Sequence, residues 1–355
     1  MNEKSKVTSF DPHGLSRRRF LISAAGGASA IAFGTVLGAC QSSATPEVAA
    51  TTESAPVAEP KAAKDSYKMV FIQFMPHTVP TAWGQGIKEI TDIQQNIDFQ
   101  VLDGQGKSDV QISLMDTAIS QGVDAIFLQP VDSVGVAPSI KKARDAGIPV
   151  ITLNIDSTEP HAAHVEMNHY FGAIDIAKTM GDMMGGKGKV AILNAPPGII
   201  IRDMRTNGFV DGLKQHHPNI EVIADQVADW DRKKAQDVFS AILTANPDVG
   251  GVYGVNDSMA LGAVDVAKSK GVLDKMVIFG NDGEKDALES IEKGELSGTQ
   301  YTDVWQQGRF AAAFTIGIAT GGVSAQAFGS QGHVLMPYII ATKDNVSAIL
   351  PHQRW

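Results

Sequence analysis

From Tyr67 onward, short apolar segments alternate with longer segments in which apolar residues recur at helical spacing. Short apolar runs flanked by turn residues predict buried strands, and the longer periodic segments predict amphipathic helices. Alternation of the two is typical of parallel βαβ units. The first series of predicted elements comprises strands at 69–74, 99–102, 124–129 and 149–154, and helices at 82–93, at 110–121 and ending near 146.

The same order of segments returns after Gly188. Strands are predicted at 190–193, 221–227, 251–255 and 276–279, with helices at 202–215, 232–245 and 259–270. The segment 146–154 is matched by 270–281, because in both a helix end at glycine is followed by an apolar strand and an asparagine. The sequence therefore predicts an α/β protein built from two similar lobes, each with a doubly wound parallel sheet.

A basic cluster and a weakly apolar segment precede these elements. Three arginines at 17–19 come before residues 22–36, in which small residues dominate, and the segment ends in Leu-Gly-Ala-Cys at Cys40. This order is typical of a signal peptide, whereas a permanent membrane span needs a more apolar run. The two ends of the segment resemble the twin-arginine export signal and the bacterial lipobox. They predict a lipoprotein signal peptide over 1–39 and a lipid on Cys40; the alternative is a membrane anchor with an incidental cysteine.

Residues 40–66 are rich in alanine, threonine, serine, proline and glutamate and have no periodic apolar face. This composition predicts a disordered tether between the lipid and the folded body. Across the whole chain, Lys+Arg 30 against Asp+Glu 39 gives a formal net charge of -9, which argues against a nucleic-acid partner. The single cysteine excludes an intramolecular disulfide and a cysteine-rich metal site.

Polar side chains follow several predicted strands at the point where each strand ends. Asn154 and Asp156 follow a strand of the first series, while Asn256 and Asp282 follow strands of the second. Because ligands bind beyond the carboxyl ends of the strands in open parallel sheets, these residues are candidate ligand contacts. The alternative is that they cap loops or the helices that follow.

Several longer motifs carry a more specific likeness. The chain resembles the periplasmic binding proteins of the ribose-binding type, the solute receptors of ABC sugar importers, over about residues 67–345. The resemblance implies the type I fold of that family, with two lobes joined by crossings near Met167, Thr302 and Leu335. The motifs are the segments 149–154, 205–209, 228–232, 247–249, 256–263 and 280–283.

The resemblance also implies a function. A monosaccharide or polyol would bind between the lobes, which close by a hinge motion, and the protein would deliver it to a membrane permease. The alternative is a receptor that presents a small molecule to a chemotaxis or sensor protein. The protein is expected in the periplasm or at the cell surface, held by its lipid, as a monomer. The expected lobes comprise 67–167 with 303–333, and 168–302 with 334–355.

Four ligand contacts are implied by positions that match the ribose-binding type. Arg205 would donate to sugar hydroxyls, Trp230 would stack on the apolar face of a pyranose, and Asn256 and Asp282 would bond to hydroxyls. A sugar hydroxyl both donates and accepts, so planar polar groups suit it, and an aromatic face covers C–H groups. The alternatives are a surface arginine on a helix for Arg205 and a place in the core for Trp230.

Other positions depart from the family pattern but fall in the expected site. His77 stands where an asparagine is expected, and Trp83 follows a turn later. Asn154 and Asp156 lie where an Asp-Arg pair is expected, and Thr302 aligns with a glutamine. These changes argue against ribose itself and suit a polyol, a deoxy sugar or a ligand with a positive group.

Two other classes of protein fit less well. His161, His164 and His169 suggest a metal-dependent enzyme, but Pro160 and the strand-like residues 164–167 put the first two histidines in a loop, with no nearby glutamate at a known metal-binding spacing. A sugar-responsive repressor would need a DNA-binding motif where this chain has the predicted signal peptide. No nucleophile with an adjacent base emerges, so we expect a binding protein without catalysis, cofactor or metal.

Overall fold

Residues 64–323 and 332–355 are described by the computed structural model. The predicted signal peptide (1–39), Cys40 and nearly all of the predicted tether (40–66) lie outside the described residues. Within the described ranges, no helix is both long enough and apolar enough to cross a bilayer.

The first sheet contains six strands: β1 (Tyr67–Gln73), β2 (Ile97–Asp103), β3 (Ala125–Leu128), β4 (Val150–Leu153), β5 (Ala163–Met167) and β11 (His333–Met336). They lie in the order β11-β5-β4-β3-β1-β2, and every neighbouring pair is parallel. Parallel sheets are covered on both faces, which explains why the central strands are nearly continuous apolar runs.

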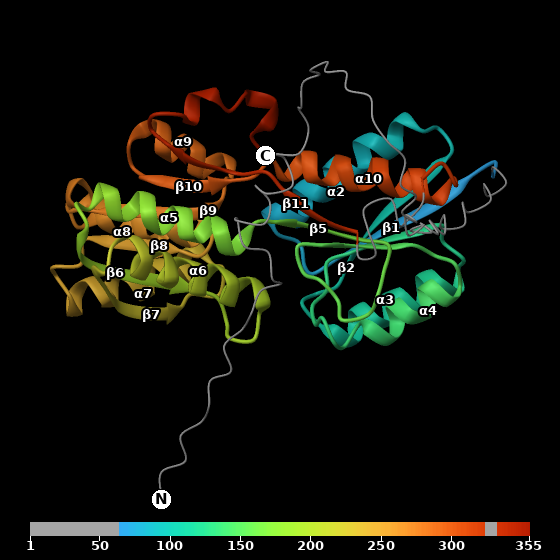
Figure 1. Ribbon diagram of the computed structural model, residues 1–355, viewed down its shortest axis with the longest axis horizontal. Coiled ribbons are helices and arrows are strands. Elements are labelled where there is room, and N and C mark those ends of the chain that lie inside the picture. Colours follow the sequence, from blue (N-terminus) through green and yellow to red (C-terminus); the bar gives the residue numbers. More distant parts are fainter. Residues whose placement is uncertain (1–63, 324–331) are drawn as a thin grey trace, which may run out of the picture. The chain divides into compact units, whose positions relative to one another are not determined.

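Four helices cover this sheet: α2 (Thr78–Ile93), α3 (Ser108–Ser120), α4 (Ala137–Asp145) and α10 (Val304–Ala319). Helices α2 and α10 lie together on one face, and α3 and α4 lie on the other (Figure 1). Successive side chains of a strand point to opposite faces, so Phe71 joins the core beneath α2 and α10, while Ile72 joins the core beneath α3 and α4. Helix α2 begins four residues before the predicted start at Ala82, with Pro80 in its first turn, where proline is tolerated.

Helices α2 and α10 approach closely enough that a glycine is required between them. A Cβ atom on Gly86 would overlap the backbone carbonyl oxygen of Trp305 in α10. We expect Gly86→Ala to lower the free energy of unfolding by about 1 to 3 kcal/mol, because the helices must move apart. Gly84 is the matched control, since its Cβ would make only ordinary van der Waals contacts, with Val101 Cγ2 at 3.5 Å and Phe71 Cδ1 at 3.7 Å. Urea unfolding should show Gly84→Ala neutral or stabilised by about 0.5 to 1 kcal/mol, and equal losses in both variants would contradict this packing.

The second sheet also contains six strands: β6 (Lys187–Asn194), β7 (Asn219–Val227), β8 (Gly251–Gly254), β9 (Val277–Asp282), β10 (Gly298–Tyr301) and β12 (Ile339–Thr342). Their order is β12-β10-β9-β8-β6-β7. All neighbours are parallel except β12, which runs antiparallel to β10 at the edge.

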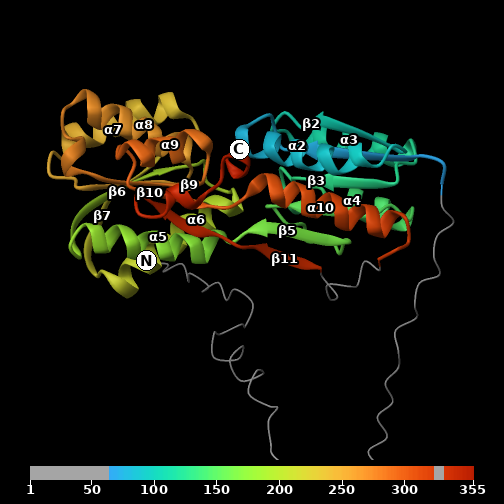
Figure 2. The same cartoon turned by 90° about the horizontal axis from the view of Figure 1, so that it is seen from above.

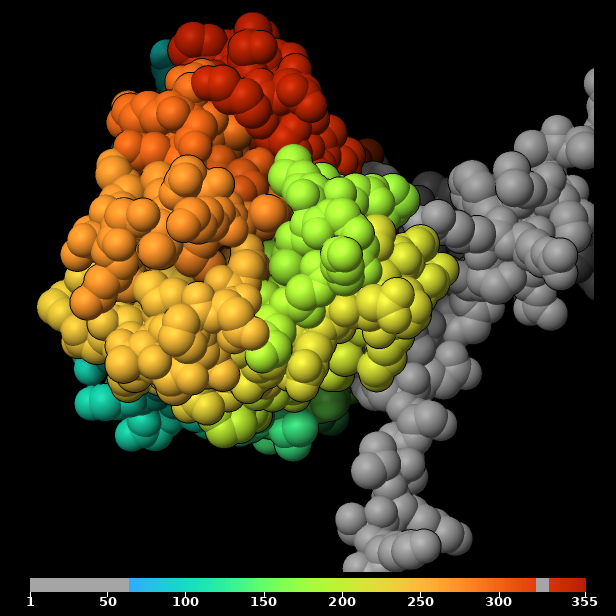
Figure 3. Space-filling view, turned by 90° about the vertical axis from the view of Figure 1, so that its left-hand side faces the viewer, coloured from blue at the N-terminus to red at the C-terminus, as the bar shows by residue number. Residues whose placement is uncertain are grey.

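Five helices cover the second sheet: α5 (His169–Met183), α6 (Ile200–His216), α7 (Arg232–Ala245), α8 (Asp257–Ser269) and α9 (Lys285–Lys293). Helices α5 and α6 pack together on one side, and α7, α8 and α9 lie on the other (Figure 2). The green segment that includes α5 borders the red C-terminal segment in Figure 3. The Tyr338 hydroxyl donates to the Asp175 carboxylate of α5 at 2.6 Å. The segment 338–349 therefore packs with this lobe, whereas Trp355 packs against the core of the first lobe.

The chain passes between the two sheets three times. It leaves the first sheet after β5, returns to it after β10 through α10, and leaves it again between β11 and β12. The predicted fold class, two doubly wound α/β lobes joined by three crossings, is confirmed. The antiparallel strand β12 is an addition that the sequence pattern did not predict.

Candidate functional site

A buried ion pair lies at the carboxyl end of the second sheet. Arg205 of α6 directs Nη2 toward Asp282 Oδ1 at the end of β9, at 2.5 Å, and the two residues are only 2% and 3% exposed. Its Nη1 donates to the carbonyl oxygen of Val255, just beyond β8, at 2.6 Å. Helix α6 thus brings a guanidinium to the ends of two neighbouring strands, where open parallel sheets bind ligands.

Two further residues hold the guanidinium in place. Arg205 Nε donates to His169 Nδ1 at 3.2 Å, so this ring nitrogen must be unprotonated. Burial and the neighbouring guanidinium lower the pKa of His169 to about 3, so the ring is neutral at pH 7. The Asn281 amide, oriented to satisfy its neighbours, accepts from Arg205 Nη2 at 3.1 Å. His169 was not among the predicted ligand residues; it lies at the start of α5, and no local motif marks it.

Asn256 directly follows Val255, whose carbonyl accepts from Arg205, and it contacts Trp230. Asn256 follows β8 and caps α8 by accepting from the Met259 N–H at 2.9 Å, and its amide donates to the Trp230 carbonyl at 3.3 Å. The capping alternative therefore holds for the Asn256 side-chain oxygen. Trp230 is half-buried, and both it and Asp229 adopt positive φ values, 62° and 53°. Such strain costs on the order of 1 kcal/mol or more per residue and tends to occur at functional sites.

Thr302 follows β10 at the crossing into α10. Its N–H donates to the Asp282 carbonyl at 3.3 Å, and its own carbonyl accepts from the Trp355 indole at 3.1 Å. The Thr302 hydroxyl is buried and has no hydrogen-bond partner among the described residues. A buried hydroxyl of this kind remains available to a polar ligand.

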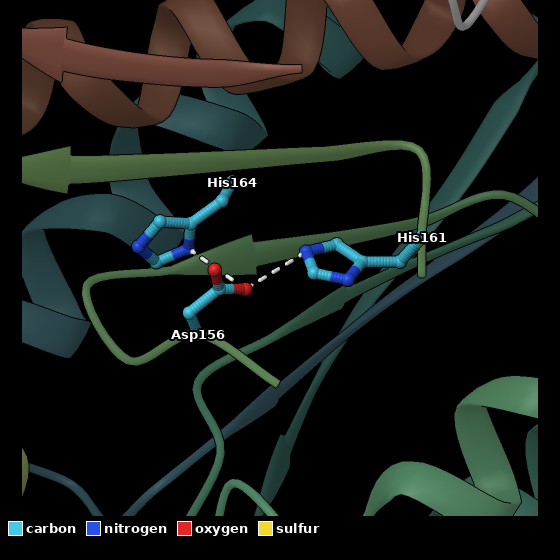
Figure 4. A group of neighbouring side chains, drawn as sticks. All are labelled: Asp156, His161 and His164. Carbon is cyan, nitrogen blue, oxygen red and sulfur yellow. Dashed lines mark ion pairs between the residues drawn. The ribbon is translucent and has the colours of Figure 1, made fainter. Parts of the chain in front are cut away.

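In the first lobe, Asn154 and Asp156 make different contacts. Asn154 is buried beyond β4 with φ 62°, a conformation that asparagine tolerates, and its side-chain oxygen accepts from the Met167 N–H at 3.0 Å. Asp156 is half-exposed and lies between His161 Nε2 at 3.2 Å and His164 Nδ1 at 3.8 Å (Figure 4). Asn154 fixes the end of β5, whereas Asp156 belongs to a histidine cluster.

His77 and Trp83 flank the start of α2. His77 is half-buried, directly precedes the helix and makes no capping hydrogen bond. Trp83 is fully buried in the core beneath α2 and α10, and its indole N–H donates to Gln307 Oε1 at 3.0 Å. The ring packs in the core and its N–H is already bonded, so the expected ligand contact at Trp83 stays a prediction.

Two carboxylic acids, Asp257 and Glu284, are buried next to the Arg205–Asp282 pair. Asp257 accepts from the Thr299 hydroxyl at 2.6 Å and from the N–H groups of Gly283 and Glu284 at 2.7 Å. Burial, followed by repulsion from nearby carboxylates, raises the pKa of Asp257 to about 7 and that of Glu284 to about 8. Glu284 therefore binds its proton more tightly in the folded state than in the unfolded state.

This difference predicts a dependence of stability on pH. A raised folded-state pKa stabilises the fold below the unfolded pKa, near 4.5, and that stabilisation is lost as the pH rises through about 8. Glu284→Gln removes the titrating carboxyl group and with it this dependence on pH. The free energy of unfolding of the variant, relative to that of the original protein, should therefore be higher at pH 8 than at pH 5 by about 1 to 3 kcal/mol. Urea unfolding at both pH values measures the difference. If the two proteins differ in free energy of unfolding by the same amount at both pH values, Glu284 is ionised in the folded state.

Comparison with known proteins decides the family. A model described as a periplasmic binding protein domain matches residues 69–322, which is most of the chain. The chain belongs to the periplasmic binding protein family. The predicted resemblance to the ribose-binding type and the prediction of a binding protein rather than an enzyme are confirmed. Membership also places the protein in the periplasm or elsewhere outside the cytoplasm.

Two curated relatives and one solved structure illustrate the similarity. The chain is 34% identical to the ribose import binding protein of Bacillus subtilis (strain 168) over 56% of this chain and 64% of that protein. It is 31% identical to a xylitol-binding protein of Mycolicibacterium smegmatis over 68% of each chain. A solute binding protein of an ABC transporter from Actinobacillus succinogenes 130z, solved with bound D-allose, superimposes with a TM-score of 0.73 at 25% identity, covering 80% of this chain and 100% of that one.

Proposed function

We propose that this protein is a solute-binding lipoprotein of an ABC importer that binds a monosaccharide or polyol. The observation that carries the proposal is the buried Arg205–Asp282 pair at the carboxyl ends of β8 and β9. A guanidinium and a carboxylate that hold each other fixed offer a donor and an acceptor in one plane, which is what a pair of neighbouring hydroxyls requires. The relatives named for ribose and xylitol support this ligand class.

The remaining contacts fall into two groups. Asn256 follows Val255, a partner of Arg205, and is bonded to the Trp230 carbonyl, and the Trp230 ring would supply an aromatic face for the C–H groups of the ligand. Asn154, His77 and Asp156 of the first lobe, with Thr302 at the crossing, would contact the opposite side of the ligand. The three crossings would act as the hinge about which the lobes close.

Closure would connect binding to transport. The lobes proposed are 67–167 with 303–333 and 168–302 with 334–355, and a membrane permease would recognise the closed form of the monomer. A lipid on Cys40 and the tether over 40–66 would keep the body close to the membrane. A flexible tether of about 25 residues has a root-mean-square reach of roughly 25 to 30 Å, which leaves room for docking on a permease.

Thermal unfolding against a ligand panel tests the proposal. The panel contains pentoses, hexoses, polyols such as xylitol and inositol, and nucleosides as a different ligand class. A ligand that binds only the folded state adds about 2.7 kcal/mol of stability at a hundredfold excess over its Kd, so its melting midpoint must rise. We expect a rise with one sugar or polyol. Cooperative melting with no rise from any sugar or polyol, in protein freed of co-purified ligand, would contradict the proposal.

A further inference from the structure

Two histidines and a glutamate meet on one face of the first sheet. His164 and Glu166 are alternate residues of β5 and so point to the same face, and His333 of β11 lies directly opposite His164 in the register. His164 Nε2 is 3.2 Å from one Glu166 carboxylate oxygen, and His333 Nε2 is 2.8 Å from the other. The two rings lie 5.1 Å apart between centroids.

Hydrogen bonds on the far side of His164 determine its tautomer. His161 Nδ1 is 2.8 Å from the Glu159 carbonyl, which can only accept, so this nitrogen carries the proton of a neutral ring. In this neutral ring, His161 Nε2 accepts from the Thr152 hydroxyl at 2.8 Å and also lies 3.2 Å from Asp156 Oδ1. The Thr152 oxygen in turn accepts from His164 Nδ1–H at 2.7 Å. The loop that holds His161 and Asp156 against His164 is visible in Figure 4.

The consequence is a lone pair that faces a carboxylate. With its proton on Nδ1, a neutral His164 directs the lone pair of Nε2 toward Glu166, and His164 is only 2% exposed. Nε2 has no hydrogen-bond partner among the described residues, despite the nearby carboxylate oxygen. Two electron-rich atoms in contact inside a protein repel each other unless a cation lies between them, and that cation is either a second proton on the His164 ring or a metal ion.

We propose that His164, Glu166 and His333 form a binding site for a divalent transition-metal ion such as Zn²⁺. Imidazole nitrogens and a carboxylate are ordinary zinc ligands, with metal–ligand distances of about 2.0 to 2.2 Å, so two ligand atoms of one tetrahedral ion lie roughly 3.3 Å apart. The distance from His164 Nε2 to Glu166 Oε2, 3.2 Å, is close to this value, while His333 Nε2 lies 2.8 Å from the other oxygen, Oε1. One ligand atom from each of the three residues can be chosen so that all lie within 4.8 Å of one another.

The surroundings suit such an ion. Metal-binding histidines usually donate their second N–H to an oxygen that orients the ring, and Thr152 does this for His164. The His333 side chain is 44% exposed, which gives an ion a route from solvent and leaves a coordination position for water. Asp156 and His161 form a second group with His164, but the nitrogen on that side is already bonded to Thr152.

The site would join an edge strand to the sheet. Strand β11 pairs only with β5 among the described strands, and both strands lead directly into crossings between the sheets. A bound ion would therefore hold β11 in place and stabilise the folded state by mass action. This inference does not depend on the identity of the sugar or polyol.

Calorimetric titration with zinc chloride tests the proposal on the purified protein after treatment with a chelator and removal of the chelator. We expect one ion per chain, a rise in the melting midpoint, and visible absorption bands when Co²⁺ replaces zinc. Glu166→Gln and His333→Gln should each weaken binding by more than about tenfold, since removal of an outer-shell partner alone typically costs 10- to 100-fold. His352→Gln, which changes an exposed histidine outside the cluster, is the matched control and should bind zinc as the original protein does.

The variants also separate the competing outcomes. His333 lies on an edge strand and is partly exposed, so His333→Gln remains informative if Glu166→Gln fails to fold. Absence of zinc binding by the original protein would overturn the proposal. So would binding that survives both Glu166→Gln and His333→Gln but is lost in His161→Gln and Asp156→Asn, because the ion would then lie on the other side of His164.

Discussion

Replacing Arg205 with methionine is expected to lower the free energy of unfolding by about 3 to 5 kcal/mol and to abolish ligand binding. The substitution leaves the Asp282 carboxylate buried without the guanidinium that lies 2.5 Å from it, and it leaves the Val255 carbonyl without its donor. An uncompensated buried charge is among the costliest single defects a fold can carry. Urea unfolding and ligand titration measure the two effects separately.

Two further variants make this prediction specific. Arg232 pairs with Asp265 through two hydrogen bonds at the surface, and Arg232→Met should cost no more than about 1 kcal/mol. The double variant Arg205→Met with Asp282→Asn should be more stable than Arg205→Met alone, because it removes the stranded charge. If Arg205→Met and Arg232→Met lower the free energy of unfolding equally, the buried ion pair contributes no more to stability than a surface ion pair.

Trp230→Ala is expected to reduce affinity for the sugar or polyol by about 100-fold or more while the protein remains folded. Aromatic side chains that cover a ligand commonly contribute about 2 to 4 kcal/mol to binding. The half-buried Trp230 ring packs only at the margin of the second core, so its loss should disturb the fold much less than its ligand. Calorimetric titration with the ligand found by the thermal panel measures the affinity.

An aromatic residue elsewhere in the same lobe provides the control. Phe171 of α5 is exposed and packs edge-to-face against Tyr170, with ring centroids 5.5 Å apart. Phe171→Ala should leave affinity unchanged. Unchanged affinity in Trp230→Ala would remove the ring from the site, whereas loss in both variants would indicate a general disturbance of the lobe.

The sequence pattern predicted most of the central strands but missed a short strand at one edge of each sheet. The central strands are covered on both faces and therefore appear as apolar runs, as in 69–74 and 124–129, which correspond to β1 and β3. Strands β11 and β12, each at one edge of its sheet, have only four residues and exposed positions, so their sequences carry no comparable signal. The longer strands β2 and β7, at the opposite edges, were predicted. Helix α5 was not predicted either, and it begins directly after the crossing from β5.

Individual residues of the site could be predicted only where a local sequence motif marks them. Arg205 and Asp282 were expected to bind ligand, but their pairing depends on α6 crossing the end of β9, which no local pattern encodes. His169 contacts Arg205 from a different helix, and its role follows only from that contact. Trp83 was expected in the site because the resembled family has aromatic residues after the first strand; in the structure, close packing of α2 on α10 encloses its ring.

The expectation of no metal site rested on spacing along the chain. That reasoning placed His161 and His164 in a loop and found no suitable glutamate, but His164 lies in β5 with Glu166 on the same face. The third candidate ligand, His333, comes from β11, far away in the sequence. Ligand sets assembled across neighbouring parallel strands leave no fixed spacing to recognise.

A crystal structure grown with the sugar or polyol that raises the melting midpoint most would test the central claim most directly. We expect the ligand to lie between the lobes, with its hydroxyls bonded to Arg205 and Asp282 and its C–H face on the Trp230 ring. A ligand bound elsewhere, or one in this region that contacts neither Arg205 nor Asp282, would contradict it.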